Sequence, residues 1–176
     1  MKILVCAGHG GTDPGNTWGG TTEAALMLEL RHIVALKLRQ AGHEVTEDGG
    51  RGVNLTLADA IRLVRGHDIA IELHTNASAN QTATGVEVIA APKNKALAQR
   101  IAQAIGRVLE IPARRDGGWF PLKTFVRERH FTPGFVRAGG LIVEVFFQSN
   151  PAELGRYRER FWLVATAIAD AVTATP

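Results

Sequence analysis

Short apolar runs alternate with longer amphipathic segments along this chain, and this alternation constrains its fold more than any other feature. Runs typical of buried strands cover residues 2–6, 43–47, 68–74, 85–90 and 140–146. Apolar residues at helical spacing cover residues 23–40, 55–65, 94–109 and the segment that follows residue 150. The alternation predicts an α/β fold in a single three-layer domain, with a largely parallel, twisted sheet of about six strands and helices on both faces.

Cap and turn residues predict where some of these elements begin and end. Asn54 is expected to cap the helix at 55–65. The run Asn150-Pro151-Ala152-Glu153 carries the cap, the proline and the acid that are typical of a helix start. Trp162 is expected in the core. Residues 111–139 show no regular pattern, and an irregular stretch of this length is expected to border a substrate.

The composition fits one domain that spans residues 1–176. Hydrophobic residues make up 45% of the chain, enough for a substantial core. No apolar stretch reaches the roughly 18 residues of a membrane helix, so no stable membrane insertion is expected. Cys6 is the only cysteine, which excludes an internal disulfide. The chain enters a strand pattern directly after Met1, so no secretory signal peptide is visible.

Positive charge is concentrated in one part of the chain. The formal net charge is only +3. One segment, however, is rich in arginine: Arg114, Arg115, Arg127, Arg129 and Arg137. This local excess favours an anionic partner or substrate, and a merely basic surface is an equally good interpretation. The segment matches no nucleic-acid-binding motif, so no nucleic-acid partner is expected, and the chain is expected to be a monomer.

Chemically active side chains stand where the predicted strands end. His9, His74 and Glu144 each follow or close an apolar run, and Glu23 opens a predicted helix. Ligands of open parallel sheets bind beyond the carboxyl ends of the strands, so we expect these side chains to meet. Two imidazoles and one carboxylate form a site for one zinc ion with an open fourth position. A remaining carboxylate supplies a base, which favours a hydrolase.

The glycine-rich loop after the first strand does not fit a phosphate-binding motif. A dinucleotide fingerprint that started at Gly8 would need glycine at position 13, where Asp13 stands. The glycines are instead expected to leave room around His9. Asp13 is expected either to orient the His9 ring by accepting a hydrogen bond or only to shape the turn before Pro14.

Five motifs follow one another in order: Gly8-His9-Gly10-Gly11-x-Asp13-x-Gly15, Glu23, Leu73-His74-x-Asn76-Ala77, Gly85-Val86-Glu87-Val88 and Ile142-Val143-Glu144-x-Phe146-x-x-Ser149-Asn150. With these motifs the chain resembles the zinc-dependent N-acetylmuramoyl-L-alanine amidases of the amidase type 3 family over residues 2–170. The resemblance implies one zinc ion held by His9, Glu23 and His74, and a catalytic carboxylate at Glu144. It also implies cleavage of the amide between N-acetylmuramoyl residues and L-alanine of the stem peptide in bacterial peptidoglycan.

Residues near these motifs are candidates for supporting roles. The candidates for binding substrate are Asn76, Arg115, Arg129 and His130. Arginine suits this task because its guanidinium group fits the carboxylates of a stem peptide. Glu72 stands where the family more often has a small polar residue. Residues two apart on a strand share a face, so Glu72 is expected beneath His74, where it either supports that ring or pairs with an arginine.

The leading interpretation is therefore a wall-degrading, and so antimicrobial, enzyme that acts in the periplasm or cell wall. It would arrive there as a mature bacterial protein or, like a phage endolysin, by release from the cytoplasm. One alternative is a zinc peptidase that cleaves another peptidoglycan amide with the same metal residues. The other is a non-catalytic peptidoglycan-binding module on the same fold, although a binder would not need His9, Glu23, His74 and Glu144 together.

Overall fold

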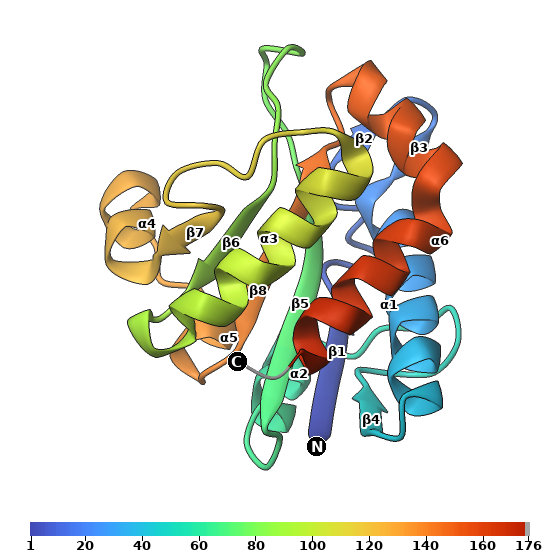
Figure 1. Ribbon diagram of the computed structural model, residues 1–176, viewed down its shortest axis with the longest axis vertical. Helices are drawn as coiled ribbons and strands as arrows, with labels where there is room; N and C mark the ends of the chain where they lie inside the picture. The colour runs from blue at the N-terminus through green and yellow to red at the C-terminus, as the bar shows by residue number, and fades with distance from the viewer. Residues whose placement is uncertain (175–176) are drawn as a thin grey trace.

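A six-stranded sheet forms the centre of the molecule in the computed structural model, which describes residues 1–174 (Figure 1). The strands lie in the order β4-β1-β5-β8-β6-β7. Their bounds are Lys2–Ala7 (β1), Glu44–Glu47 (β4), Ile69–Asn76 (β5), Glu87–Ala90 (β6), Trp119–Pro121 (β7) and Leu141–Phe147 (β8). All neighbouring pairs are parallel except β6 and β8. The predicted α/β fold with a largely parallel sheet is confirmed.

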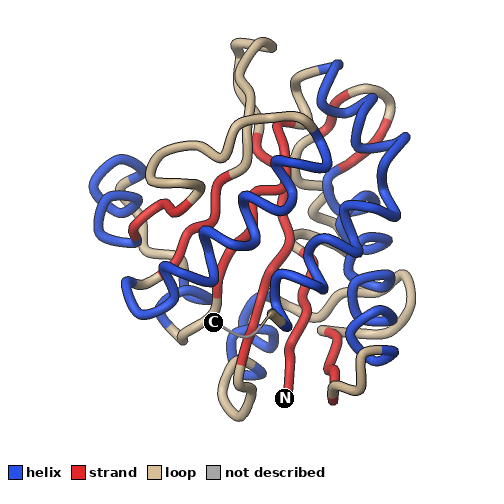
Figure 2. Tube along the Cα trace, in the orientation of Figure 1, coloured by secondary structure: helices blue, strands red, loops and turns tan. Residues whose placement is uncertain are grey.

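Helices cover both faces of this sheet and complete the three layers (Figure 2). The long helices α1 (Glu23–Gln40), α3 (Lys95–Leu109) and α6 (Pro151–Thr173) pack on one face. The shorter helices α2 (Leu57–Leu63), α4 (Leu122–Arg129) and α5 (Gly134–Arg137) pack on the other face. A 3₁₀ turn (Pro92–Asn94) precedes α3. Within residues 1–174, no helix combines the length and the apolar character needed to cross a bilayer.

Side-chain caps fix the starts of the helices that matter for the site. The Thr22 hydroxyl accepts a hydrogen bond from the backbone N–H of Ala25, so α1 begins at Glu23. Asn150 caps α6 as predicted, because its side-chain oxygen accepts from the N–H groups of Ala152 and Glu153. The Glu153 carboxylate is fully buried and accepts from the backbone N–H of Phe147, which ties α6 to the end of β8.

Three expectations about local structure are wrong. Asn54 does not cap α2, because Thr56 accepts the capping hydrogen bond from Asp59. Residues 111–139 are not irregular throughout, since they contain β7, α4 and α5. Trp162 is 60% exposed, because its position on α6 faces solvent rather than the core.

The glycine-rich loop carries a small hairpin of its own. Strands β2 (Thr17–Trp18) and β3 (Thr21–Thr22) pair in antiparallel fashion directly before α1. The backbone N–H of Glu23 donates to the carbonyl of Asn16, so the hairpin closes against the first turn of α1. This closure fixes the position from which the Glu23 side chain leaves the helix.

Candidate metal centre

Strand pairing brings the predicted site residues to one edge of the sheet. His74 on β5 pairs with Glu144 on β8, and Glu144 pairs with Glu87 on β6. Residues paired across neighbouring strands point to the same face of the sheet. The side chains of His74, Glu144 and Glu87 therefore form a row across that face. His9 follows β1, and Glu23 is the first residue of α1. Segments that are far apart in the sequence therefore meet at the carboxyl ends of β1, β5 and β8.

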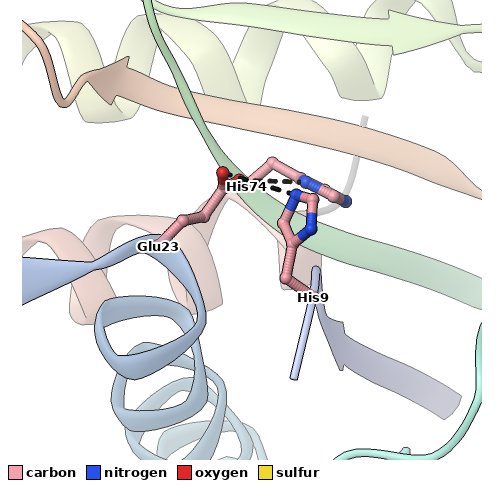
Figure 3. A group of neighbouring side chains, drawn as sticks. All are labelled: His9, Glu23 and His74. Carbon is pink, nitrogen blue, oxygen red and sulfur yellow. Dashed lines mark hydrogen bonds and ion pairs between the residues drawn. The ribbon is translucent and has the colours of Figure 1, made fainter. Parts of the chain in front are cut away.

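His9, Glu23 and His74 converge on one point (Figure 3). His9 Nε2 lies 3.4 Å from Glu23 Oε2, and His74 Nδ1 lies 3.1 Å from Glu23 Oε1. One nitrogen or oxygen from each residue falls within 4.8 Å of the other two. In a tetrahedral zinc site the donor atoms stand roughly 3.3 Å apart, given metal–ligand bonds of about 2.0–2.1 Å. The spacing and the donor types thus fit a zinc ion.

The charges of these residues also suit a cation. Glu23 is buried, with 1% of its surface exposed, and accepts hydrogen bonds from the backbone N–H groups of Asn16 and Thr75. Burial would raise the Glu23 pKa, but the hydrogen bond and the charge of His74 hold this pKa below its usual value. Burial would likewise lower the His74 pKa, yet Glu23 and Glu72 keep it well above the usual range. A divalent cation can replace the proton that this pair holds.

Two glycines make room for the ligand side chains. A Cβ added at Gly8 would lie 2.1 Å from Cε1 of His74, and one added at Gly15 would lie 2.7 Å from Cδ2 of His9. The expectation that glycines leave space around His9 is thus met by Gly15. Asp13 Oδ2 lies 2.8 Å from His9 Nδ1, and its Oδ1 accepts from the N–H of Gly15. Asp13 therefore both orients the ring and shapes the turn, and the hydrogen bond from His9 lowers the Asp13 pKa.

A buried polar network behind His9 was not found from the sequence. Asn54 Nδ2 donates to the carbonyls of Ala7 and His9, and its Oδ1 accepts from Arg31 at 2.6 Å. Arg31 is fully buried and also donates to Asp48 at 2.9 Å. His9 has a left-handed backbone with φ 64, and the bond from Asn54 to its carbonyl stabilises this conformation. One sequence feature could have indicated this network: Arg31 lies directly after Leu30, on the apolar side of a helix.

Glu144 stands beside the three converging residues. Its Oε2 is shielded from solvent and has no hydrogen-bond partner within residues 1–174. Burial raises the Glu144 pKa to about 7, the charge of His74 opposes this rise, and the charges of Glu23 and Glu87 add to it. A buried carboxylate oxygen without a protein partner is available to bind a water, an ion or a substrate group. The pKa of Glu144 suits a group that accepts and returns a proton near neutral pH.

A cavity of about 550 Å³ opens beside these residues. His9, His74 and Glu144 line one end of it. Its remaining walls are largely apolar and include Leu55, Leu57, Ile89, Phe125 and Phe131. The cavity lies on the sheet face that α2, α4 and α5 cover, between the loop before α2 and the loop that leads from α4 to α5.

The predicted substrate-binding residues occupy different surroundings. Asn76 Nδ2 donates to Glu87, and Arg115 is held by Glu87 and Glu128, with its guanidinium group 3.5 Å from the centre of the Phe120 ring. Arg129 and His130 are exposed at the end of α4. The positive charge of Arg129 lowers the pKa of Glu144.

Comparison with known proteins gives a family. Residues 3–174 match the family model described as N-acetylmuramoyl-L-alanine amidase. A solved structure from Neisseria meningitidis, provisionally named an N-acetylmuramoyl-L-alanine amidase, is 40% identical, with a TM-score of 0.88. The match covers 97% of this chain and 93% of the Neisseria chain.

Other relatives are more distant. The catalytic domain of the CD27L endolysin, which targets Clostridium difficile, is 25% identical with a TM-score of 0.73, and the match covers 98% of this chain and 96% of that domain. A Staphylococcus aureus protein named "Probable autolysin PH" is 29% identical over 137 residues. That match covers 65% of this chain but only 28% of the length of the staphylococcal protein.

Proposed function

The chain belongs to the N-acetylmuramoyl-L-alanine amidases of the amidase type 3 family, and from this premise we propose that it is a zinc hydrolase of bacterial peptidoglycan. The bond it cleaves is the amide between the lactyl group of N-acetylmuramic acid and L-alanine of the stem peptide. One zinc ion would be held by His9, Glu23 and His74, and Glu144 would be the catalytic acid–base residue. We further propose that residues 1–176 act as one catalytic domain and as a monomer.

The convergence of three metal-ligand side chains next to a buried carboxylate carries this proposal. His9, Glu23 and His74 supply donor atoms within 4.8 Å of one another, and Glu144 pairs with His74 on the neighbouring strand. A peptidoglycan-binding module would gain nothing from a buried acid whose pKa lies near 7. The arrangement is what metal-assisted hydrolysis requires, with three protein ligands and a base within reach of the remaining position.

The chain's own residues account for the proton transfers of the reaction. Bound zinc would act as a Lewis acid that polarises the scissile carbonyl and makes a water more acidic. Glu144 accepts a proton from the attacking water, whose oxygen adds to the lactyl carbonyl carbon. The carbon–nitrogen bond then breaks, and Glu144 returns the proton to the departing alanine nitrogen. Asp13 keeps the His9 ring in place during these steps through the bond to its Nδ1.

The surroundings of the site suggest how a substrate lies. Arg129 is exposed and its charge reaches Glu144, so it is the best placed arginine to meet a carboxylate of the stem peptide. Arg115 and Asn76 contact Glu87 instead, and a role in binding substrate would require them to exchange this partner. His130 follows Arg129 and would act in the same region. The apolar walls of the cavity suit the methyl and ring carbons of the muramyl group.

Digestion of purified peptidoglycan tests this function. We expect new alanine amino termini that disappear when a chelator is added and return with zinc. His74→Ala should lose both bound zinc and activity. His43→Ala is the matched control, because His43 lies at the opposite end of the sheet, near the amino terminus. New amino groups on other residues would instead identify a zinc peptidase, and no new chain ends in any condition would identify a binding module.

The route by which the enzyme reaches its substrate is a separate question. The likeness to the catalytic domain of an endolysin supports a phage-type lysin, and the likeness to the Neisseria protein supports a bacterial enzyme. Both routes place the site against the cell wall. Lysis of intact cells by externally added protein would support the antimicrobial use, and cleavage of purified wall alone would argue against it.

A further inference from the structure

Glu72 is a buried acid that faces one of the proposed metal ligands. Only 5% of its surface is exposed, and it lies in the wall of the cavity beside His9 and His74. Its Oε2 stands 3.2 Å from Nε2 of His74. Of the two partners predicted from the sequence, His74 is present, and no arginine forms an ion pair with Glu72 within residues 1–174. A buried carboxylate without a partner is energetically costly. The contact with His74 is therefore expected to compensate for the burial of Glu72.

The two nitrogens of the His74 ring face two different acids. Nδ1 lies 3.1 Å from Oε1 of Glu23, on the side where the ligand atoms converge. Nε2, the other ring nitrogen, lies 3.2 Å from Oε2 of Glu72. Although Glu72 is close, its contact with the ring is not a complete hydrogen bond, and Nε2 is a buried nitrogen without a hydrogen-bond partner among the described residues. The 3.2 Å between Nε2 and Oε2 nevertheless lies within the range of an N–H···O hydrogen bond.

Sheet pairing holds Glu72 in a rigid position. On β5 it pairs with Cys6 of β1 on one side and with Ile142 of β8 on the other. It therefore stands on an interior strand, two residues before His74 and on the same face. A carboxylate anchored in this way can fix the orientation of an imidazole more precisely than a loop residue can.

We propose that Glu72 is a positioning residue that holds His74 with its Nε2–H toward the sheet and the lone pair of Nδ1 toward the metal. The proposal rests on the proposed function, because it requires zinc at His9, Glu23 and His74. A metal-bound imidazole normally donates its second N–H to a carboxylate or carbonyl, and this donation fixes the ring and strengthens the metal bond. Gly8 leaves the space in which the ring lies, and Glu72 determines which nitrogen faces the metal.

Zinc affinity of Glu72 variants tests the proposal on the full chain. Zinc is titrated in competition with a chromophoric chelator against wild type, Glu72→Leu, Glu72→Gln and Glu72→Asp. Glu72→Leu should bind zinc about 10- to 100-fold more weakly, the usual effect of losing such a partner. Glu72→Gln should lie between Glu72→Leu and wild type, because it keeps an acceptor oxygen in nearly the same place.

Glu72→Asp separates positioning from simple charge. It keeps the negative charge but withdraws the carboxylate by one methylene, so positioning predicts an affinity close to that of Glu72→Leu. If only charge mattered, Glu72→Asp would match wild type and Glu72→Gln would match Glu72→Leu, and that outcome would overturn the proposal. Wild-type affinity in Glu72→Leu would overturn it as well.

Imidazole nitrogen resonances give a second readout that a purely structural role would not change. In zinc-loaded wild type, ¹⁵N spectra should show metal bound at Nδ1 of His74 and a proton at Nε2. Metal at Nε2 would overturn the proposal. In Glu72→Leu the Nε2 proton should exchange faster with solvent, and unchanged exchange would count against Glu72 as its acceptor. Wild type that binds no zinc would remove the proposed function itself, whereas normal zinc binding with indifferent variants would remove only this inference.

Discussion

Replacing Gly8 with alanine should displace a proposed zinc ligand without straining the backbone. The added Cβ would lie 2.1 Å from Cε1 and 2.4 Å from Nδ1 of His74. Carbon atoms in contact stand about 3.5 Å apart, so the imidazole would have to retreat by about 1 Å or more. Zinc–nitrogen bonds of about 2.0–2.1 Å tolerate deviations of only about 0.2 Å. Gly8 does not have a left-handed backbone, so alanine changes the contact with His74 and little else.

Zinc affinity is the quantity that this change should alter. A displacement of this size should weaken binding at least about a hundredfold, or about 2.7 kcal/mol, in competition with a chromophoric chelator. Gly50→Ala is the matched control, because nothing lies within 4 Å of a Cβ added at Gly50 and its φ is not left-handed. Both variants should keep the circular dichroism of the wild type. Wild-type zinc affinity in Gly8→Ala would refute the reasoning, because it would show that His74 either moves freely or does not hold the metal.

Four further predictions concern the base, the metal and the loop behind His9. Glu144→Gln should retain zinc and lose turnover by about 10²- to 10⁴-fold, and comparable rates would remove Glu144 from its role. Wild-type turnover should fall toward acid pH with a midpoint at or below about 7, because only the ionised Glu144 accepts a proton. A bound cation can only lower the Glu144 pKa, which sets the upper limit of this midpoint. A flat profile down to pH 5 would contradict the prediction. Zinc affinity should weaken as pH falls, because the His74 pKa is raised and its proton must leave before the metal binds. Calorimetry in buffers of different ionisation enthalpy should detect the released proton. Asn54→Ala should lower the free energy of urea unfolding by about 2–4 kcal/mol, because it removes bonds to Ala7 and His9 and leaves buried Arg31 short of an acceptor; a change below about 0.5 kcal/mol would be inconsistent with the network.

Periodic patterns and caps were sufficient to predict most of the fold. The helix from Glu23 to Gln40 has the predicted bounds because Thr22 caps it and its apolar residues repeat at helical spacing. The strands that carry His74 and Glu144 were found because both are interior strands, whose residues are apolar almost without interruption. The β–α alternation predicted a largely parallel sheet, and the meeting of the site residues was expected because they stand at carboxyl ends of strands. The strand order itself was not predicted.

Features that depend on tertiary contacts were not visible in the sequence. The short elements β7, α4 and α5 have no period long enough to detect, and they form because side chains such as Phe120 and Phe135 are buried against the sheet. Asn54 and Thr56 are both of residue types that cap helices. In the structure the Asn54 side chain accepts a hydrogen bond from buried Arg31 instead, and Thr56 caps α2. The partner of Glu72 was likewise undecided, because a sequence shows which residues share a strand face but not how far an arginine reaches.

The ligand set joins parts of the chain that lie far apart in sequence, with Glu23 and His74 separated by 51 residues. A cation held between them would therefore work as a removable crosslink, closing a large chain loop in a protein whose lone cysteine cannot form one. Because Glu23 and His74 share a hydrogen bond without the metal, and α1 and β5 also contact each other, loss of the ion would weaken the link at this corner while the hydrophobic layers stay assembled. The bound ion would then add to the rigidity of this corner as well as to its chemistry.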